Sequence, residues 1–187
     1  MAQIIGLTGE KGGGKGTFAE ILKEFLPGLE HIRFSDVLLG IAAELGIPKG
    51  EVSREQLQKL APALEEIFGK GCITRGVKSR IQKSGDNTIV LDGIRWHSDL
   101  EMLRSLPNST LVYITANPKV RFKRTKKRKE KSGEDKATLE KFLKEEQAET
   151  EKYIPEIGAQ ANYKIENNGS LEKFRRKVEV FYIFKTR

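Results

Sequence analysis

Residues 9–17 of the chain read Gly9-Glu10-Lys11-Gly12-Gly13-Gly14-Lys15-Gly16-Thr17, and they follow the apolar run Ile4-Ile5-Gly6-Leu7. The stretch has the G-x-x-x-x-G-K spacing of a phosphate-binding P-loop. Because glycine has no Cβ, a glycine-rich backbone can turn its N–H groups inward around an anion. We therefore predict that this loop holds a nucleotide's phosphates through Gly9, Gly12, Gly13, Gly14, Lys15, Gly16 and Thr17.

The elements on both sides of this loop have the order that a P-loop requires. The β-branched run before it is typical of a strand, and residues 17–26 place four apolar side chains on one helical face. The helix N-terminus adds the positive end of its dipole, and Lys15 adds a mobile charge for the terminal phosphates. Gly16 stands where a Mg²⁺-binding Ser or Thr usually follows the lysine, and Thr17 comes one place later.

The composition is that of one soluble globular domain spanning residues 1–187, with 37% hydrophobic and 32% charged residues. No apolar run approaches the length of a bilayer span, so we expect a cytoplasmic protein without a membrane partner. The formal net charge is +8, and a basic run at residues 123–129 carries much of the excess. Such a run is either a solvated helix face or a surface for phosphate-rich ligands.

Short apolar strands are expected at residues 31–34, 88–92, 110–115 and 161–166, alternating with amphipathic helices. The expected helices cover residues 36–45, 53–68, 71–83 and 137–153, followed by a closing helix from Leu171. Pro62 predicts a break or kink in the second of these helices. Capping boxes are expected at residues 53–56 and 98–101, and Asn117-Pro118 begins the basic helix.

This alternation predicts an α/β sandwich with a parallel sheet, in which ligands bind beyond the carboxyl ends of the strands. The P-loop and four polar segments each follow an expected strand, so we place them at one edge of the sheet. The four segments begin at Asp36, Asp92, Asn117 and Asn167.

Phosphoryl transfer needs charge neutralisation and alignment, and the residues at this edge can supply both. Lys15 would hold the β- and γ-phosphates, Thr17 would touch a phosphate oxygen or the Mg²⁺ shell, and Asp92 could anchor Mg²⁺ through water. Arg95 could fork onto the phosphate of an acceptor. Gly93 stands where water-activating ATPases usually have an acidic residue, so the expected acceptor is a substrate phosphate.

A family resemblance rests on these same residues. The P-loop resembles that of adenylate kinase and other nucleoside monophosphate kinases, and Asp92-Gly93-Ile94-Arg95 looks like a shortened form of their D-G-x-x-R motif. Phe34-Ser35-Asp36 is similar to the F-[AS]-D segment of deoxynucleoside monophosphate kinases. Residues 165–171 look like a stretch of dephospho-coenzyme A kinases that lies near the adenine of ATP.

The resemblance implies a three-layer αβα P-loop fold with a five-stranded parallel sheet, a helical acceptor-binding insertion at about residues 35–85 and a short lid at about residues 124–140. It implies ATP and Mg²⁺ as cofactors, with Mg²⁺ held near Thr17 and Asp92. The catalytic residues would be Lys15, Arg95, Arg124 and Arg128. Besides the P-loop, Arg124, Asn168 and Gly169 would bind ATP. The acceptor would be bound by Asp36, Arg75, Arg80, Asp92 and Arg95.

Two alternatives to a (deoxy)nucleoside monophosphate kinase stay open: a dephospho-coenzyme A kinase, and a P-loop ATPase that binds nucleic acid through residues 123–129. We expect small nucleotides as partners in preference to nucleic acid, and a monomer or homodimer. Glu10 and Lys11 are expected to point outward, because the phosphate geometry does not constrain them. His97 is expected to be structural, and Trp96 to be buried beside a strand end.

Overall fold

The computed structural model describes residues 3–85, 87–128 and 138–185. All strand pairs in its central five-stranded sheet are parallel, and the strand order is β2-β3-β1-β4-β5. This confirms the predicted parallel α/β architecture. The strands are β1 (Ile4–Thr8), β2 (Glu30–Arg33), β3 (Ile89–Asp92), β4 (Ser109–Thr115) and β5 (Tyr163–Glu166).

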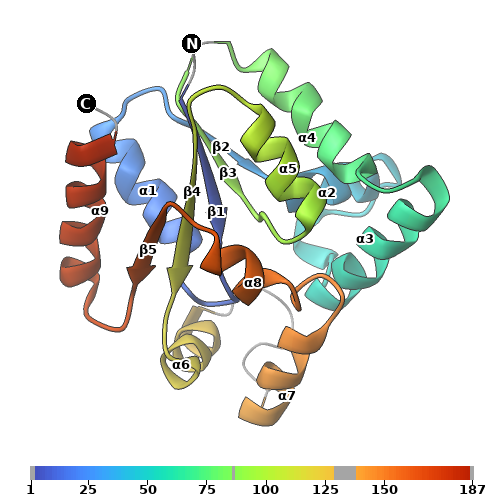
Figure 1. Cartoon of the computed structure of the whole chain (residues 1–187). Helices are drawn as coiled ribbons and strands as arrows, with labels where there is room; N and C mark the ends of the chain where they lie inside the picture. The colour runs from blue at the N-terminus through green and yellow to red at the C-terminus, as the bar shows by residue number, and fades with distance from the viewer. Residues whose placement is uncertain (1–2, 86, 129–137, 186–187) are drawn as a thin grey trace.

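The sheet is buried on both faces, which explains why its strands read as short apolar runs. Along β1, Ile4 packs into one hydrophobic cluster, whereas Ile5 and Leu7 pack into the other. Helices α1 (Lys15–Phe25) and α9 (Leu171–Lys185) cover one face (Figure 1). The opposite face packs against α2 (Phe34–Glu44), α4 (Cys72–Lys83), α5 (His97–Ser105) and α8 (Ile154–Ala159).

The helices between β2 and β3 form one group beside the sheet. Helix α3 (Arg54–Phe68) packs on α2 and α4, and the short 3-10 helix η1 (Lys49–Glu51) precedes it. The predicted capping box is confirmed, because Ser53 and Gln56 each accept a hydrogen bond from the other's backbone N–H. The expected break at Pro62 does not occur, since α3 runs through it. Helix α2 begins two residues earlier than expected, at Phe34, whose side chain is buried in the core.

The capping box expected at Ser98–Glu101 is wrong by two residues. Helix α5 begins at His97, with Trp96 as its N-cap residue, and the Asp99 carboxylate accepts hydrogen bonds from the backbone N–H groups of Arg95 and Trp96. A carboxylate in the first helical turn satisfies N–H groups that have no partner within the helix. This cap fixes the backbone that follows β3.

The single helix expected at residues 137–153 is also wrong. Helix α7 (Leu139–Lys144) passes into the 3-10 helix η2 (Glu145–Gln147), and turns lead from there to α8. Glu145, Glu146 and Glu151 in this segment form ion pairs with residues from other parts of the chain, and one straight helix would not present them to these partners.

The basic helix α6 (Pro118–Arg128) begins where Asn117-Pro118 predicted, and it lies with α7 below the carboxyl ends of the strands (Figure 1). Residues 129–137, which hold most of the predicted lid, lie outside the described residues. Among the helices that the structure describes, none combines the length and apolar character needed to span a membrane.

Candidate functional site

The glycine-rich loop joins β1 to the N-terminus of α1, where the backbone makes turns that only glycine adopts easily. Gly9 and Gly14 have φ angles of 145° and 115°. A Cβ on Gly14 would lie 2.5 Å from Asn167 Nδ2, and one on Gly9 would lie 2.0 Å from the Ile114 carbonyl oxygen. The loop therefore packs too tightly for side chains at these positions, as expected of a backbone that surrounds an anion.

The ammonium group of Lys15 folds back onto its own loop. Its Nζ donates hydrogen bonds to the carbonyl oxygens of Gly9 at 2.6 Å and Glu10 at 3.4 Å. Desolvation lowers the pKa of Lys15, although the nearby Asp92 carboxylate opposes the shift. The cation is thus held at the mouth of the loop, next to the N-terminus of α1, where a phosphate would bind.

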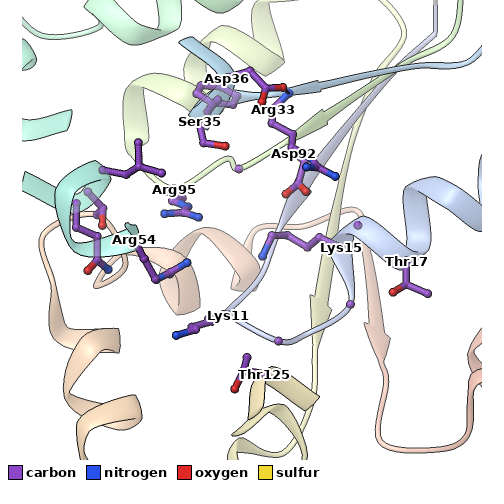
Figure 2. A pocket seen from close by; sticks show the side chains of 18 of the residues that line it. Lys11, Lys15, Thr17, Arg33, Ser35, Asp36, Arg54, Asp92, Arg95 and Thr125 are labelled. Atoms are coloured by element: carbon purple, nitrogen blue, oxygen red, sulfur yellow. Dashed lines mark hydrogen bonds between the residues drawn. The ribbon is translucent and has the colours of Figure 1, made fainter. Parts of the chain in front are cut away.

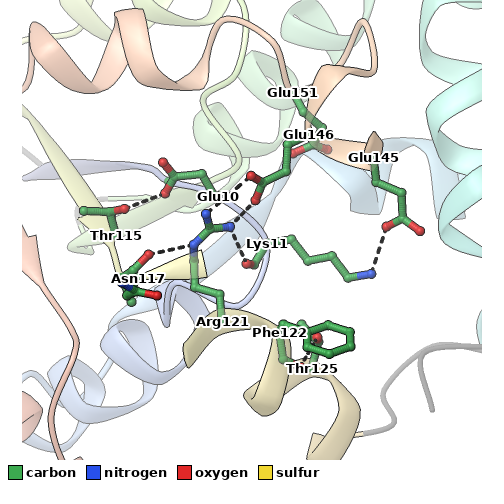
Figure 3. Close-up of polar contacts among 12 residues, drawn as sticks. Glu10, Lys11, Thr115, Asn117, Arg121, Phe122, Thr125, Glu145, Glu146 and Glu151 are labelled. Carbon is green, nitrogen blue, oxygen red and sulfur yellow. Dashed lines mark hydrogen bonds and ion pairs between the residues drawn. The ribbon is translucent and has the colours of Figure 1, made fainter. Parts of the chain in front are cut away.

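The expectation that Glu10 and Lys11 point outward is wrong. The Glu10 carboxylate accepts hydrogen bonds from the Tyr113 hydroxyl at 2.5 Å and the Thr115 hydroxyl at 2.8 Å, both on β4. Lys11 Nζ lies 3.1 Å from a carboxylate oxygen of Glu145 in η2. Figure 3 marks this ion pair with a dashed line. These contacts fix the tip of the loop to the sheet on one side and to η2 on the other.

A cavity of about 880 Å³ opens over the carboxyl ends of the strands, with the P-loop along one wall (Figure 2). Ten of the predicted site residues line it: Gly12, Gly14, Lys15, Gly16, Thr17, Asp36, Asp92, Arg95, Arg124 and Gly169. Five others do not: Gly9, Gly13, Arg75, Arg80 and Asn168. Arg128 belongs to α6, but its side chain lies outside the described part of the structure.

Asp92 ends β3 beside the P-loop strand, where its backbone is in register with Leu7 of β1. Burial raises the pKa of this carboxyl, but the His31 ring at 3.5 Å, Lys15 and Arg95 outweigh the burial and hold the pKa below its ordinary value. The group is therefore an anion at neutral pH. Carboxylate and hydroxyl oxygens are ligand types that Mg²⁺ takes, and Asp92 and Thr17 line the same cavity.

Arg95 is fixed both at its backbone and at its side chain. Its backbone N–H donates to Asp99, and its guanidinium donates to Glu151 at 2.6 Å. Arg54, at the start of α3, donates to the same Glu151 oxygen at 2.7 Å. Arg54 and Glu151 were not among the predicted site residues, because each lies far along the chain from the motifs and only the fold brings them to Arg95.

Of the predicted acceptor residues on α2 and α4, one lines the cavity and two do not. Asp36 lines the cavity and accepts a hydrogen bond from the Arg33 backbone N–H. Arg80 donates to the Asp36 carbonyl oxygen, and Arg75 donates to carbonyl oxygens of Phe68 and Lys70 near the end of α3. Both arginines bond to backbone oxygens and neither lines the cavity, whereas Arg54 does.

On the other side of the P-loop, Arg124 of α6 is bonded to the loop that follows β5. Its guanidinium donates to the carbonyl oxygens of Asn167 at 2.7 Å and Gly169 at 3.1 Å, and burial lowers the pKa of Arg124. Asn168 accepts a hydrogen bond from the Asn117 backbone N–H at 2.7 Å. Arg124 and Gly169 thus lie together at the cavity wall. Asn168 does not line the cavity and connects its loop to the backbone just before α6.

Residues 8–142 match a protein family described as an AAA domain. A UPF0200 protein of Sulfurisphaera tokodaii is 33% identical over 180 residues, which cover 96% of this chain and 95% of the relative. The chain belongs to the UPF0200 family. A second UPF0200 protein, from Pyrococcus abyssi, is 31% identical over 182 residues, which cover 95% of this chain and 94% of the relative.

Solved structures show that this UPF0200 protein has the fold of P-loop kinases. The structure of TT1252 from Thermus thermophilus aligns with a TM-score of 0.62 at 21% identity, over 98% of this chain and 97% of that one. A shikimate kinase from Acinetobacter baumannii, solved with shikimate, aligns with a TM-score of 0.56 at 18% identity, over 98% and 93%. At these identities the likeness concerns the fold alone.

The candidate site of this chain thus combines a phosphate loop, the Asp92 anion and four arginines, Arg33, Arg54, Arg95 and Arg124, around one cavity. Among the residues that the structure describes, no cluster of three or more His, Cys, Asp or Glu side chains could hold a metal ion by itself. A magnesium ion here would need oxygens from a bound substrate in addition to Asp92 and Thr17, as is usual for Mg²⁺ at phosphate sites.

Proposed function

We propose that this UPF0200 protein is a phosphotransferase that moves the γ-phosphate of ATP, with Mg²⁺, onto the phosphate of a nucleoside or deoxynucleoside monophosphate. One observation carries the proposal: a single cavity has the P-loop with Lys15 on one wall and the arginines Arg54 and Arg95 on another. A P-loop alone supports binding of a donor nucleotide. Fixed arginines at the same cavity support an anionic acceptor as well.

On the donor side, the α1 N-terminus and the loop N–H groups would bind the phosphates of ATP, and Lys15 would leave the Gly9 carbonyl to neutralise the γ-phosphate. Arg124 and the Asn167–Gly169 loop would then border the adenine and ribose. Bound Mg²⁺ would neutralise charge between the donor phosphates, with Asp92 and Thr17 as its protein neighbours.

On the acceptor side, the wall between α2 and α3 is largely apolar, with Leu38, Leu39, Leu57 and Ala61 in the cavity lining. Such a surface suits the flat face of a nucleobase, whereas the guanidiniums of Arg54 and Arg95 suit its phosphate. Phosphoryl transfer needs little covalent help from the protein, so holding the two phosphates in line and excluding water would provide the catalysis.

The proposal is tested by incubating the protein with Mg-ATP and each of the eight common ribo- and deoxyribonucleoside monophosphates, with dephospho-coenzyme A as a ninth acceptor. We expect one or a few nucleoside monophosphates to become diphosphates, resolved by ion-exchange chromatography, and Lys15→Ala to abolish this product. Phosphorylation of dephospho-coenzyme A alone would replace the proposed acceptor. If no acceptor is phosphorylated while long nucleic acid stimulates ADP release, the kinase proposal fails.

A further inference from the structure

Glu151 joins the two arginines of the acceptor wall through a single oxygen atom. Its Oε1 accepts hydrogen bonds from Arg95 at 2.6 Å and from Arg54 at 2.7 Å. The Glu151 side chain is 4% exposed and does not line the cavity, whereas both arginines do. The carboxylate therefore lies behind the guanidiniums, on the side away from the ligand space, and does not occupy the place of a ligand.

We propose that Glu151 is a positioning residue that holds Arg54 and Arg95 together as one clamp for the phosphate of the acceptor. The proposal rests on the proposed phosphotransferase function and names a residue that acts through its two neighbours. Each guanidinium has five N–H donors in a planar fork, so one bond to Glu151 restricts the position of the group and leaves other donors to bind phosphate.

Holding long side chains in place before the ligand arrives strengthens binding, because the rotamer entropy is lost on folding and not on association. Arg95 has its backbone fixed by Asp99, and Arg54 is the first residue of α3, within the capping box that Ser53 and Gln56 form. Beyond these contacts, the guanidiniums of both side chains share the Glu151 carboxylate, which orients them toward each other. Without its carboxylate, the two cations would repel each other and separate.

The charge state of Glu151 fits this role. Burial raises the pKa of its carboxyl group, but Arg95, Arg54 and Lys15 act in the opposite direction and keep the pKa below its ordinary value. Glu151 is therefore ionised at neutral pH. The group formed by Arg54, Arg95 and Glu151 carries a net positive charge and still attracts an anion.

Glu151 is itself held in place by the segment that precedes it. Glu145 pairs with Lys11 of the P-loop, and Glu146 pairs with Arg121 of α6, whose side chain is nearly buried (Figure 3). Residues 145–151 thus connect the tip of the P-loop to the arginine clamp. This connection explains why residues 139–153 do not form one straight helix, since three carboxylates must reach four basic residues, Lys11, Arg121, Arg54 and Arg95.

The test compares Glu151→Gln with Glu149→Gln, a control whose exposed carboxylate pairs with Lys152. Steady-state rates are measured with Mg-ATP and the nucleotide that the wild type phosphorylates. We expect Glu151→Gln to raise the KM for that acceptor at least tenfold and to change the KM for ATP less than twofold. The control should match the wild type in both constants.

A second measurement follows acceptor binding without catalysis. Trp96 is the only tryptophan in the sequence and lines the cavity next to Arg95, so its fluorescence reports on this wall. With ADP filling the P-loop, inorganic phosphate is titrated into the wild type and Glu151→Gln, and we expect at least tenfold weaker binding to the variant. This readout remains valid if no nucleotide in the panel is phosphorylated, so the two proposals fail separately.

Two results would contradict the proposed role of Glu151. If Glu151 acted only through its negative charge, Glu151→Gln would bind phosphate more tightly than the wild type; equal or tighter binding therefore contradicts positioning. If Glu151→Gln does not fold, Glu151→Asp replaces it, because the charge is kept and the reach is shortened. We expect Glu151→Asp to raise the acceptor KM severalfold, and an unchanged KM would overturn the proposal.

Discussion

The guanidinium of Arg124 donates a hydrogen bond to the carbonyl oxygen of Asn167 at 2.7 Å. Asn167 in turn donates from its side-chain amide to the carbonyl oxygen of Gly13 in the P-loop at 3.0 Å. The basic helix α6, the loop after β5 and the phosphate loop are therefore connected through one buried asparagine. A substitution of Arg124 should therefore weaken the binding of a nucleotide in the P-loop.

Arg124→Met should raise the KM for ATP by roughly tenfold, because hydrogen bonds to charged groups contribute about 1.5–3 kcal/mol each and only part of this reaches the nucleotide. The acceptor KM should stay nearly constant, since Arg54 and Arg95 are untouched. Lys123→Met is the matched control, because it removes the same charge from an exposed neighbouring position. An equal rise in both variants would assign the effect to net charge instead.

Gly14 and Gly16 offer a matched pair within the P-loop. Gly14→Ala puts a Cβ 2.5 Å from Asn167 at a φ of 115°, so we expect a loss of about 1–3 kcal/mol in the free energy of unfolding and of most nucleotide binding. Gly16 has no heavy atom within 4 Å of its ideal Cβ and lies in the first turn of α1. Gly16→Ala should therefore keep or slightly raise stability.

Urea unfolding and binding of a fluorescent ATP analogue measure both effects. If the two variants lose equal stability and equal nucleotide binding, the close packing around Gly14 is not the reason why the loop requires glycine there.

The central sheet and the P-loop could be predicted from the sequence because their signals are local. Buried parallel strands appear as short apolar runs, and the glycine spacing carries the loop geometry by itself. The edge of the sheet that carries the site could also be predicted, since Asp92 ends a strand and Lys15 and Arg95 lie in segments that follow a strand.

The acceptor wall could not be predicted in the same way, because it is built from contacts between distant segments. Arg54 is one of 34 basic residues, and nothing in its neighbourhood distinguishes it until Glu151 lies beside it. The apolar spacing of residues 137–153 favours one helix. The ion pairs of Glu145, Glu146 and Glu151 instead stabilise two short helices joined by turns to α8. Tertiary contacts here override a helical pattern.

Asp99 predicts a pH dependence of stability. Burial raises the pKa of its carboxyl group from 3.8 to about 6, although the backbone N–H groups of Arg95 and Trp96 and the Thr74 hydroxyl favour the ion. The folded state therefore binds this proton more tightly than the unfolded chain does. The wild type should lose stability relative to Asp99→Asn as the pH rises from 4 to 7, by up to about 3 kcal/mol.

Urea unfolding followed by Trp96 fluorescence at several pH values gives this difference. The lowered pKa values of Asp92 and Glu151 have the opposite effect, because they destabilise the fold as the pH falls. The wild type and Asp99→Asn both contain these two carboxyl groups, so their contribution cancels in the difference between the two proteins. A difference that is independent of pH, or that grows as the pH falls, would contradict the role assigned to Asp99.

The nearly buried contacts of Arg121 predict a large loss of stability when this residue is replaced. Its side chain is 4% exposed, donates to the Ala116 carbonyl oxygen at 2.8 Å and to Glu146, and stacks over the Phe142 ring at 5.7 Å. Arg121→Met leaves Glu146 without this partner in a partly buried place. Breaking such a pair costs about 3–5 kcal/mol in the free energy of unfolding.

Replacing both partners should cost less than this single change, because no charge is then left unpaired. In urea unfolding, Arg121→Met/Glu146→Met is therefore expected to be more stable than Arg121→Met alone, with a coupling of about 1–3 kcal/mol. Arg176→Met is the control, since its pair with Glu172 is fully solvated on α9 and should contribute nothing measurable. If Arg121→Met and Arg176→Met unfold at the same urea concentration, the contacts of Arg121 do not hold residues 145–151 against the P-loop.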